Sequence, residues 1–388
     1  MSAQAGNIVY LGPPGWTREQ AIIESQRLGF DEPLWLGRRG YGVGWVAQNR
    51  STAPAKADAR ALWQSGNGVF LPGLVASGLT AQQANIVAAQ RLVERILEGE
   101  GGADLLDEEP YATRLTPQFE LLASTCDEGD DQEIETLEFD VLANGNIVAE
   151  NLWVKLSWLS YDEDDASLRF RFSFGMVGYE DVAEDYQRQH YAAQLTEAVF
   201  PESYIISANP EVERILCATL AIKAPAYVER IVYFNAPNGG AQFHQDVERG
   251  HLGVIFAQVY GRTSWLAVPK PSLIEEIQRY LARPDAHAGL IEAGVKPRGL
   301  KTLLDKAANR DSLSAYLDDH QNDPLDILLN RVPVFAQQLI EARYGYMLEP
   351  GDVILLPQQG IGHCCWHSVF CMDDYIGEAL SFAVRERP

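Results

Sequence analysis

The sequence predicts a mainly β protein with α-helical additions, and two features favour this fold class. Between Glu135 and Gly178, apolar and polar residues alternate in three runs, which are separated by an Asn-Gly pair and by an acidic loop. This pattern indicates a meander of half-buried strands. Apolar residues recur at helical spacing in Thr80–Glu98 and again between residues 271 and 345. We therefore expect helices both before and after the meander.

The segments that flank the meander are expected to be partly helical. A helix is predicted from Thr17 to Leu28, and a more regular one from Thr80 to Glu98 with Thr80 as its N-cap. The acidic, glycine-bearing stretch 99–110 is expected to be a loop. After the meander, residues 179–200 have the pattern of a helix.

The segment Phe243-His244-Gln245-Asp246 carries the strongest chemical signal. In a strand, side chains two residues apart share a face, so His244 and Asp246 point into one cavity while Gln245 points away. A strand with two exposed polar residues would give the same triplet. With one more histidine, the pair forms the two-histidine, one-carboxylate set that binds iron(II) on one face and leaves other positions open.

Two stretches resemble the Jumonji C branch of the cupin-type oxygenases. The first is YFNAPNGGAQFHQDVERGHLGVIFAQVYGRTSWLAVP, where a glycine-bearing turn precedes the His-x-Asp strand. The second is EPGDVILLPQQGIGHCCWHSV, with a Pro-Gly-Asp-Val strand, a proline turn and a Trp-His pair. The family's Gln-x-x-Gly-x-x-x-Trp-Leu segment and its closing proline are matched by Gln258, Gly261, Trp265, Leu266 and Pro269.

The resemblance implies a double-stranded β-helix (a jelly-roll or cupin core) in residues 135–388, with the meander in the same domain. Residues 1–134 are then an N-terminal α/β extension. Residues 271–345 form a helical insertion between the ligand-bearing strands, serving as a lid, a subunit interface or a packing layer over one sheet. Its helices are expected at Ser272–Leu281, Gly299–Ala308, Ser312–Asp319 and Pro333–Ala342.

The resemblance also assigns the third metal ligand, for which two histidines compete. His367 follows Trp366 and stands before the closing strand at a family-like spacing, so we favour it over His363. His251 lies close behind the first pair, but the glycines around it suggest an exposed insertion tip. The expected metal ligands, and the catalytic set, are His244, Asp246 and His367.

The second implied cofactor is 2-oxoglutarate, and here the sequence departs from the family. Many members have lysine or arginine where this chain has Thr263. The threonine hydroxyl is expected to hydrogen-bond the distal carboxylate of 2-oxoglutarate but cannot neutralise it. Arg262 should point away from the cavity. Arg385, on the last strand, is an alternative base or merely a surface residue. Tyr233 and Asn235 are expected to add neutral hydrogen bonds.

The implied function is an iron(II)- and 2-oxoglutarate-dependent dioxygenase that hydroxylates a C–H bond of a peptide, a protein side chain or an amino-acid-derived metabolite. Because Asp246 leaves no free position for a halide, hydroxylation is favoured over halogenation. Two alternatives stay open: a cupin metalloenzyme with oxygen or isomerisation chemistry that does not use 2-oxoglutarate, and a non-catalytic cupin-fold binding protein.

Composition narrows the classes of partner and the cellular location that we expect for this protein. The net charge of −23 over 388 residues argues against nucleic acid as a partner. No apolar run reaches membrane-spanning length, and the N-terminus lacks a signal-peptide pattern. The five cysteines have no paired spacing, which disfavours a disulfide scaffold or a zinc site and suits the cytoplasm. A homodimer would use the insertion or the N-terminal part.

Overall fold

The computed structural model describes residues 6–49, 59–161, 164–174, 185–319 and 323–387. Its centre is a pair of antiparallel sheets between which the chain passes back and forth, with one pair of consecutive strands in the same sheet. The major sheet has the order β13-β10-β15-β9, and the minor sheet the order β12-β11-β14. The strands are β9 (Pro225–Asn235), β10 (Gly253–Tyr260), β11 (Thr263–Pro269), β12 (Gly345–Leu348), β13 (Val353–Gly360), β14 (His363–Cys371) and β15 (Gly377–Glu386).

An eighth segment completes the minor sheet at its free edge. His244 forms an isolated antiparallel bridge with His367 of β14, so the chain passes from β9 to the minor sheet before it returns as β10. Four strands in each sheet, visited in this order, make a double-stranded β-helix. The predicted fold class is confirmed.

The predicted meander extends the major sheet beyond β9, so it belongs to the same sheet as the core. In β6 (Glu133–Ala143), β7 (Asn146–Trp158) and β8 (Leu168–Phe174), one face is buried and the other is more polar. Asn144 and Gly145 have φ of 52° and 74°, as a two-residue hairpin turn requires.

Residues before 135 also take part in the core sheet. β5 (Phe119–Thr125) pairs with β6, and β4 (Val69–Leu71) pairs with β13. The first residues form a separate three-stranded sheet of β1 (Ile8–Gly12), β3 (Tyr41–Gln48) and β2 (Leu34–Arg38). The division of the chain at residue 135 stays a prediction.

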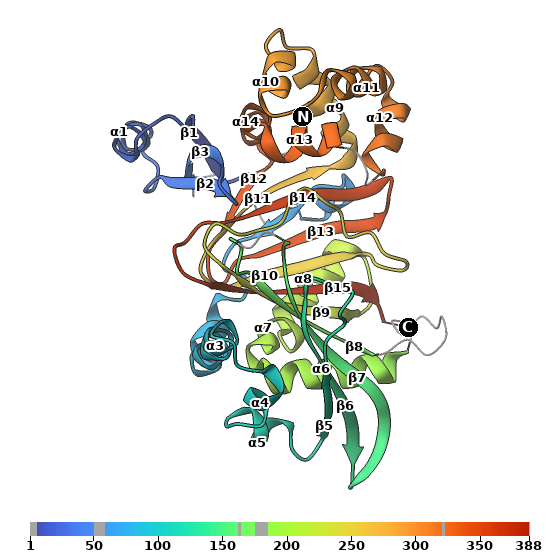
Figure 1. Ribbon diagram of the computed structural model, residues 1–388. Coiled ribbons are helices and arrows are strands. Elements are labelled where there is room, and N and C mark those ends of the chain that lie inside the picture. The colour runs from blue at the N-terminus through green and yellow to red at the C-terminus, as the bar shows by residue number, and fades with distance from the viewer. Residues whose placement is uncertain (1–5, 50–58, 162–163, 175–184, 320–322, 388) are drawn as a thin grey trace.

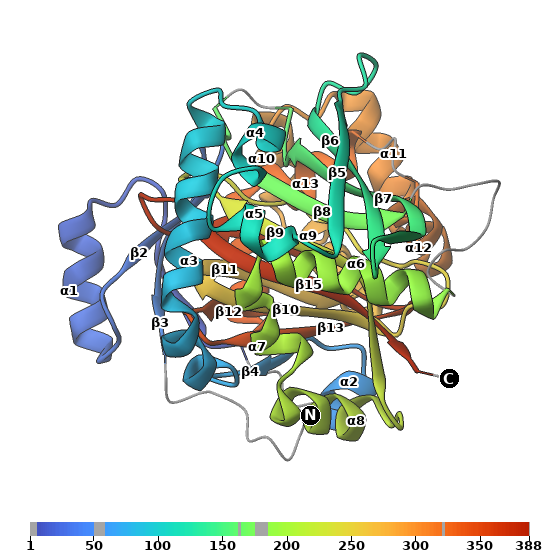
Figure 2. The same cartoon turned by 90° about the horizontal axis from the view of Figure 1, so that it is seen from below.

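Helices cover both outer faces, as Figures 1 and 2 show. Apolar side chains of α3 (Ala76–Leu97), α6 (Tyr186–Val199) and α7 (Tyr204–Ser207) pack on the major sheet in one core cluster. The insertion packs on the minor sheet in a second cluster. The remaining helices on the first side are α2 (Ala59–Gln64), α4 (Gly102–Leu106), α5 (Tyr111–Leu115), the 3-10 turn Pro201–Ser203 and α8 (Pro210–Leu220).

The insertion helices agree with the sequence prediction in four places. The insertion comprises α9 (Lys270–Leu281), α10 (Ala286–Glu292), α11 (Pro297–Ala307), α12 (Arg310–Leu317), α13 (Asp323–Arg331) and α14 (Pro333–Glu341). The sequence prediction missed the short α10 and α13. Their contact with the minor sheet shows a packing layer, one of the roles expected for this segment.

Three local predictions for the N-terminal part had different outcomes. The helix α1 (Arg18–Leu28) begins after Thr17, whose side chain caps it. The longer helix α3 begins at Ala76 and not at Thr80, because its start has no side-chain cap that the sequence could reveal. The stretch 99–110 is not a continuous loop, since it contains α4. Among the described residues, no helix is long and apolar enough to cross a membrane.

Candidate metal centre

The three predicted ligands meet at one cavity. His244 and His367 exchange backbone hydrogen bonds, with N···O distances of 3.0 and 2.9 Å, and their ring centroids are 4.2 Å apart. Asp246 lies between the rings: one carboxylate oxygen is 3.4 Å from Nε2 of His244, and the other is 3.4 Å from Nε2 of His367. The three donor atoms all lie within 4.8 Å of one another.

Both imidazoles are oriented by backbone carbonyls. Nδ1 of His244 is 2.7 Å from the carbonyl oxygen of Gln242, and Nδ1 of His367 is 3.3 Å from that of Cys365. With the Nδ1 proton held there, each neutral ring presents the lone pair of Nε2 to Asp246 and the space beside it. This is the arrangement that metal-binding histidines adopt.

The charges of Asp246 and His367 suit a bound cation, and His244 would bind one in its deprotonated form. The two imidazoles lower the pKa of Asp246 although burial opposes this, so it is ionised at neutral pH. Burial and the neighbouring His244 lower the pKa of His367 to about 4, which keeps its ring neutral. For His244, burial lowers the pKa, but attraction to Asp246 outweighs it and the pKa is raised. Two imidazole nitrogens and a carboxylate oxygen form the donor set of a mononuclear iron(II) site.

The triad lines a cavity of about 340 Å³ in the barrel. The ring of Trp265 stacks on His367 with centroids 5.4 Å apart, and it forms part of the wall with Phe256. Of the His244 and Asp246 side chains, 42% and 37% are exposed, whereas His367 is 4% exposed. The cavity is therefore open on the side of the His-x-Asp segment and closed behind His367.

The glycine-bearing turn before His244 is required by close packing. Gly240 has a φ of 127°, and a side chain there would collide with the carbonyl oxygen of Val369 on β14. This close approach lets Ala241 and Val369 exchange backbone hydrogen bonds of 3.1 and 2.8 Å, three residues before the His244 bridge.

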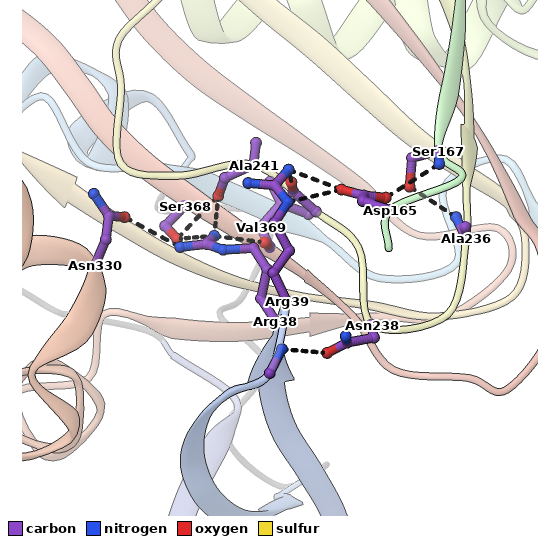
Figure 3. Close-up of polar contacts among 12 residues, drawn as sticks. Arg38, Arg39, Asp165, Ser167, Ala236, Asn238, Ala241, Asn330, Ser368 and Val369 are labelled. Atoms are coloured by element: carbon purple, nitrogen blue, oxygen red, sulfur yellow. Dashed lines mark hydrogen bonds and ion pairs between the residues drawn. The ribbon is translucent and has the colours of Figure 1, made fainter. Parts of the chain in front are cut away.

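The N-terminal sheet supports the two ligand strands through Arg38, at the end of β2 (Figure 3). Its guanidinium donates to Oγ of Ser368 (2.8 Å), to the carbonyls of Val369 (2.9 Å) and Ala241, and to Oδ1 of Asn330 (3.1 Å). Asn330 in turn accepts a hydrogen bond from the backbone N–H of Phe243. We call this set the Arg38 network. It joins residues directly beside His244 and His367.

Arg39 extends the same support toward the meander. It pairs with the buried Asp165 at 2.8 Å and donates to the carbonyl of Gly240 at 2.6 Å (Figure 3). Asp165 accepts from the N–H of Ser167, whose hydroxyl accepts from the N–H of Ala236. Neither arginine was predicted from the sequence, because their partners lie between 126 and 331 residues away along the chain.

The four residues predicted to bind the cosubstrate separate into two groups. Tyr233 and Asn235 line the cavity. Thr263 is buried outside the lining, where its hydroxyl donates to Gln258 and accepts from the indole of Trp265. Arg385 also lies outside the lining and donates to the carbonyl of Arg249. Arg262 points away, as expected, and pairs with Asp373.

The structure also separates the other histidines. His363 lines a different hollow with Arg60 and Trp63, so His367 is the one that joins the pair. The prediction that His251 is exposed is wrong, because it is 4% exposed and lines the cavity. The glycines on either side suggested a loop tip, but Gly253 already begins β10. His251 lies with Glu229 and Glu248 in a second cluster of metal-capable side chains.

Two cavity residues were missed by the sequence analysis. Arg169 and Arg171 of β8 line the cavity together with Tyr233 and Asp246. In sequence they looked like the polar positions of an alternating strand, and only the pairing of β8 with β9 brings them to the site.

Comparisons with known proteins add similarities at the level of the fold. No family model matches the chain, and no curated protein matches it. Among solved structures, it is similar to a 2OG-Fe(II) oxygenase family oxidoreductase from Burkholderia pseudomallei, with 9% identity and a TM-score of 0.29, over 86% of this chain and 92% of that one.

A second similarity is to YcfD, a ribosomal oxygenase from Escherichia coli. The identity is 11% and the TM-score 0.23, and the match covers 72% of this chain and 44% of that one. A YcfD structure with cobalt and succinic acid gives 12% and 0.22, over 67% and 41% of the two chains. At these TM-scores the similarities carry no argument about the site, so the functional argument rests on the side chains themselves.

Proposed function

We propose that this protein is an iron(II)- and 2-oxoglutarate-dependent oxygenase. The observation that carries the proposal is the meeting of His244, Asp246 and His367 at an open cavity, with both Nδ1 atoms held by backbone carbonyls. A structural role alone does not require two histidines and an ionised aspartate to face one point. The resemblance of the surrounding motifs to Jumonji C oxygenases supports the same function.

In this proposal His244, Asp246 and His367 hold the metal. Bound iron(II) and 2-oxoglutarate together supply the activation of dioxygen for hydroxylation of a C–H bond. Asp246 supplies one negative charge, and the two neutral rings leave the rest of the metal's charge for an anionic ligand. Trp265 stacks on the ring of His367 and so orients it, and Phe256 adds an apolar part to the wall.

The substrate class follows from the family resemblance: a peptide, a protein side chain or an amino-acid-derived metabolite. A second candidate function is a cupin metalloenzyme that does not use 2-oxoglutarate. The observation that favours it is Thr263, which takes the place of the family's base and is engaged with Gln258 and Trp265.

The anaerobic visible spectrum of the iron(II) protein tests these alternatives. On addition of 2-oxoglutarate, we expect a charge-transfer band of the chelated keto acid that is absent in His244→Ala. Bound iron without such a band would contradict the oxygenase proposal and favour the second candidate. A protein that takes up no iron at stoichiometric level would contradict both.

A further inference from the structure

The cavity has a basic wall that comes from outside the eight-strand barrel. In the β8–β9 ladder, Arg169 is paired with Tyr233 and Arg171 with Ile231. Directly paired residues in an antiparallel sheet share one face, with Cβ atoms about 5 Å apart. The alternating residues Leu168, Phe170 and Phe172 lie in the core on the other face. Both arginines therefore project on the cavity side, next to Tyr233.

The charges along this wall leave one guanidinium without a counter-charge. Among the described lining residues, the charged groups besides the histidines are Arg169, Arg171, Glu229, Asp246 and Glu248. Asp246 lies between the two imidazoles, and Arg171 forms an ion pair with Glu229. Nε of Arg169 donates to Oγ of Ser157 at 2.9 Å. Of the described carboxylates, none lies within ion-pair distance of Arg169.

Tyr233 connects Arg169 to the metal end of the cavity. The pKa of Tyr233 is raised to about 12, chiefly by burial; the Asp246 carboxylate raises it further and the Arg169 guanidinium lowers it. The phenol therefore lies within electrostatic reach of both side chains. A small molecule at the triad would have the Tyr233 hydroxyl and the Arg169 guanidinium along the same wall.

We propose that Arg169 and the hydroxyl of Tyr233 form a carboxylate-binding site on the β8–β9 wall of the cavity that the triad also lines. The site would take the distal carboxylate of a 2-oxo dicarboxylic acid whose keto end lies at the metal, and in this form the inference rests on the proposed function. A half-buried guanidinium fork matches a carboxylate with two parallel hydrogen bonds. The Arg169 guanidinium would supply the positive charge that Thr263 cannot provide. A carboxylate on an acidic substrate offers the same chemistry.

Two keto acids that differ only at the distal end test this site. Iron(II)-loaded protein is titrated anaerobically with 2-oxoglutarate and with 2-oxobutyrate, which lacks the distal carboxylate, and binding is followed by the charge-transfer band. Arg169→Gln should weaken 2-oxoglutarate at least about tenfold and change 2-oxobutyrate less than about twofold. The matched control Arg171→Gln should leave both within about threefold, because Arg171 is held by Glu229.

Further variants and ligands separate the outcomes. Arg169→Lys keeps the charge without the fork and should restore part of the affinity, which a folding defect would not allow. Unchanged 2-oxoglutarate binding in Arg169→Gln overturns the assignment to the distal carboxylate.

If wild type shows no band with either keto acid, the proposed function fails, and calorimetric titration of the metal-loaded protein with glutarate tests the carboxylate site alone. Glutarate binding that is lost in Arg169→Gln supports the site; binding that persists overturns it. Competition between glutarate and 2-oxoglutarate identifies the cosubstrate as the source of the carboxylate, whereas simultaneous binding identifies an acidic substrate.

Discussion

Asp246 and Glu378 are two carboxylic acids in opposite surroundings. Asp246 faces an open cavity with an imidazole on each side, and its pKa is lowered. Glu378, at the start of β15, is fully buried beside the equally buried Glu202, and burial raises the pKa of both, that of Glu202 to about 7. The carboxyl group is thus ionised in one place, and burial favours its protonated form in the other. Burial alone does not mark a functional carboxylate; its neighbours and its access to a cavity do.

The largest expected effect is the loss of iron(II) affinity when Asp246 is replaced, compared with the same replacement at Glu378. Asp246→Asn should lower iron(II) affinity at least about a thousandfold, which is about 4 kcal/mol, because it removes the one anionic donor of the triad. Glu378→Gln makes the same replacement of a carboxyl group by an amide in the closed pair and should leave the affinity within about twofold. Metal titration of both variants checks this. Equal losses of iron(II) affinity in the two variants would show that the metal does not bind specifically at the triad.

Arg38 offers a second buried charge, balanced by carbonyl oxygens and not by a described carboxylate. Arg38→Met should lower the free energy of unfolding by about 3 kcal/mol, because the buried hydrogen bonds from its guanidinium to Ser368, Asn330 and the carbonyls of Ala241 and Val369 are all lost. Denaturant unfolding measures the change. Arg18→Met, which removes an exposed ion pair with Glu32, should cost less than about 1 kcal/mol. A similar small loss for Arg38→Met would contradict the role of the Arg38 network.

The acid pair should make stability depend on pH. Glu202 and Glu378 hold protons in the native state that they release on unfolding, so their contribution is complete below pH about 4.5 and decreases as the pH rises toward about 7. The decrease should be on the order of 2 kcal/mol. Because His367 and His244 also titrate in this range, the difference between wild type and Glu202→Gln isolates the pair. Parallel pH profiles of the two proteins would contradict the shared protonated state.

The meeting of His244 and Asp246 was predictable from the sequence, because they are two residues apart and an extended segment directs alternate side chains to one face. The β8–β9 wall of the cavity was not. Arg169 precedes Tyr233 by more than sixty residues, and only the sheet pairing makes them neighbours. The Arg38 network was not predicted either, because its residues are also far apart in the sequence. His251 was misjudged because adjacent glycines suit a strand start as well as a turn. Sequence patterns thus revealed local geometry and motif resemblance, but not which distant strands complete the wall.

The smallest expected effect concerns Arg385, which sequence position favoured as the base for the distal carboxylate. Its guanidinium donates to the carbonyl of Arg249 and packs against Gly250, outside the cavity lining. Arg385→Gln should therefore change the affinity for 2-oxoglutarate by less than about threefold. A loss as large as that expected for Arg169→Gln would move the carboxylate site from β8 to β15. Measuring Arg385→Gln and Arg169→Gln in the same titration therefore decides whether β15 or β8 provides the positive charge that binds the distal carboxylate.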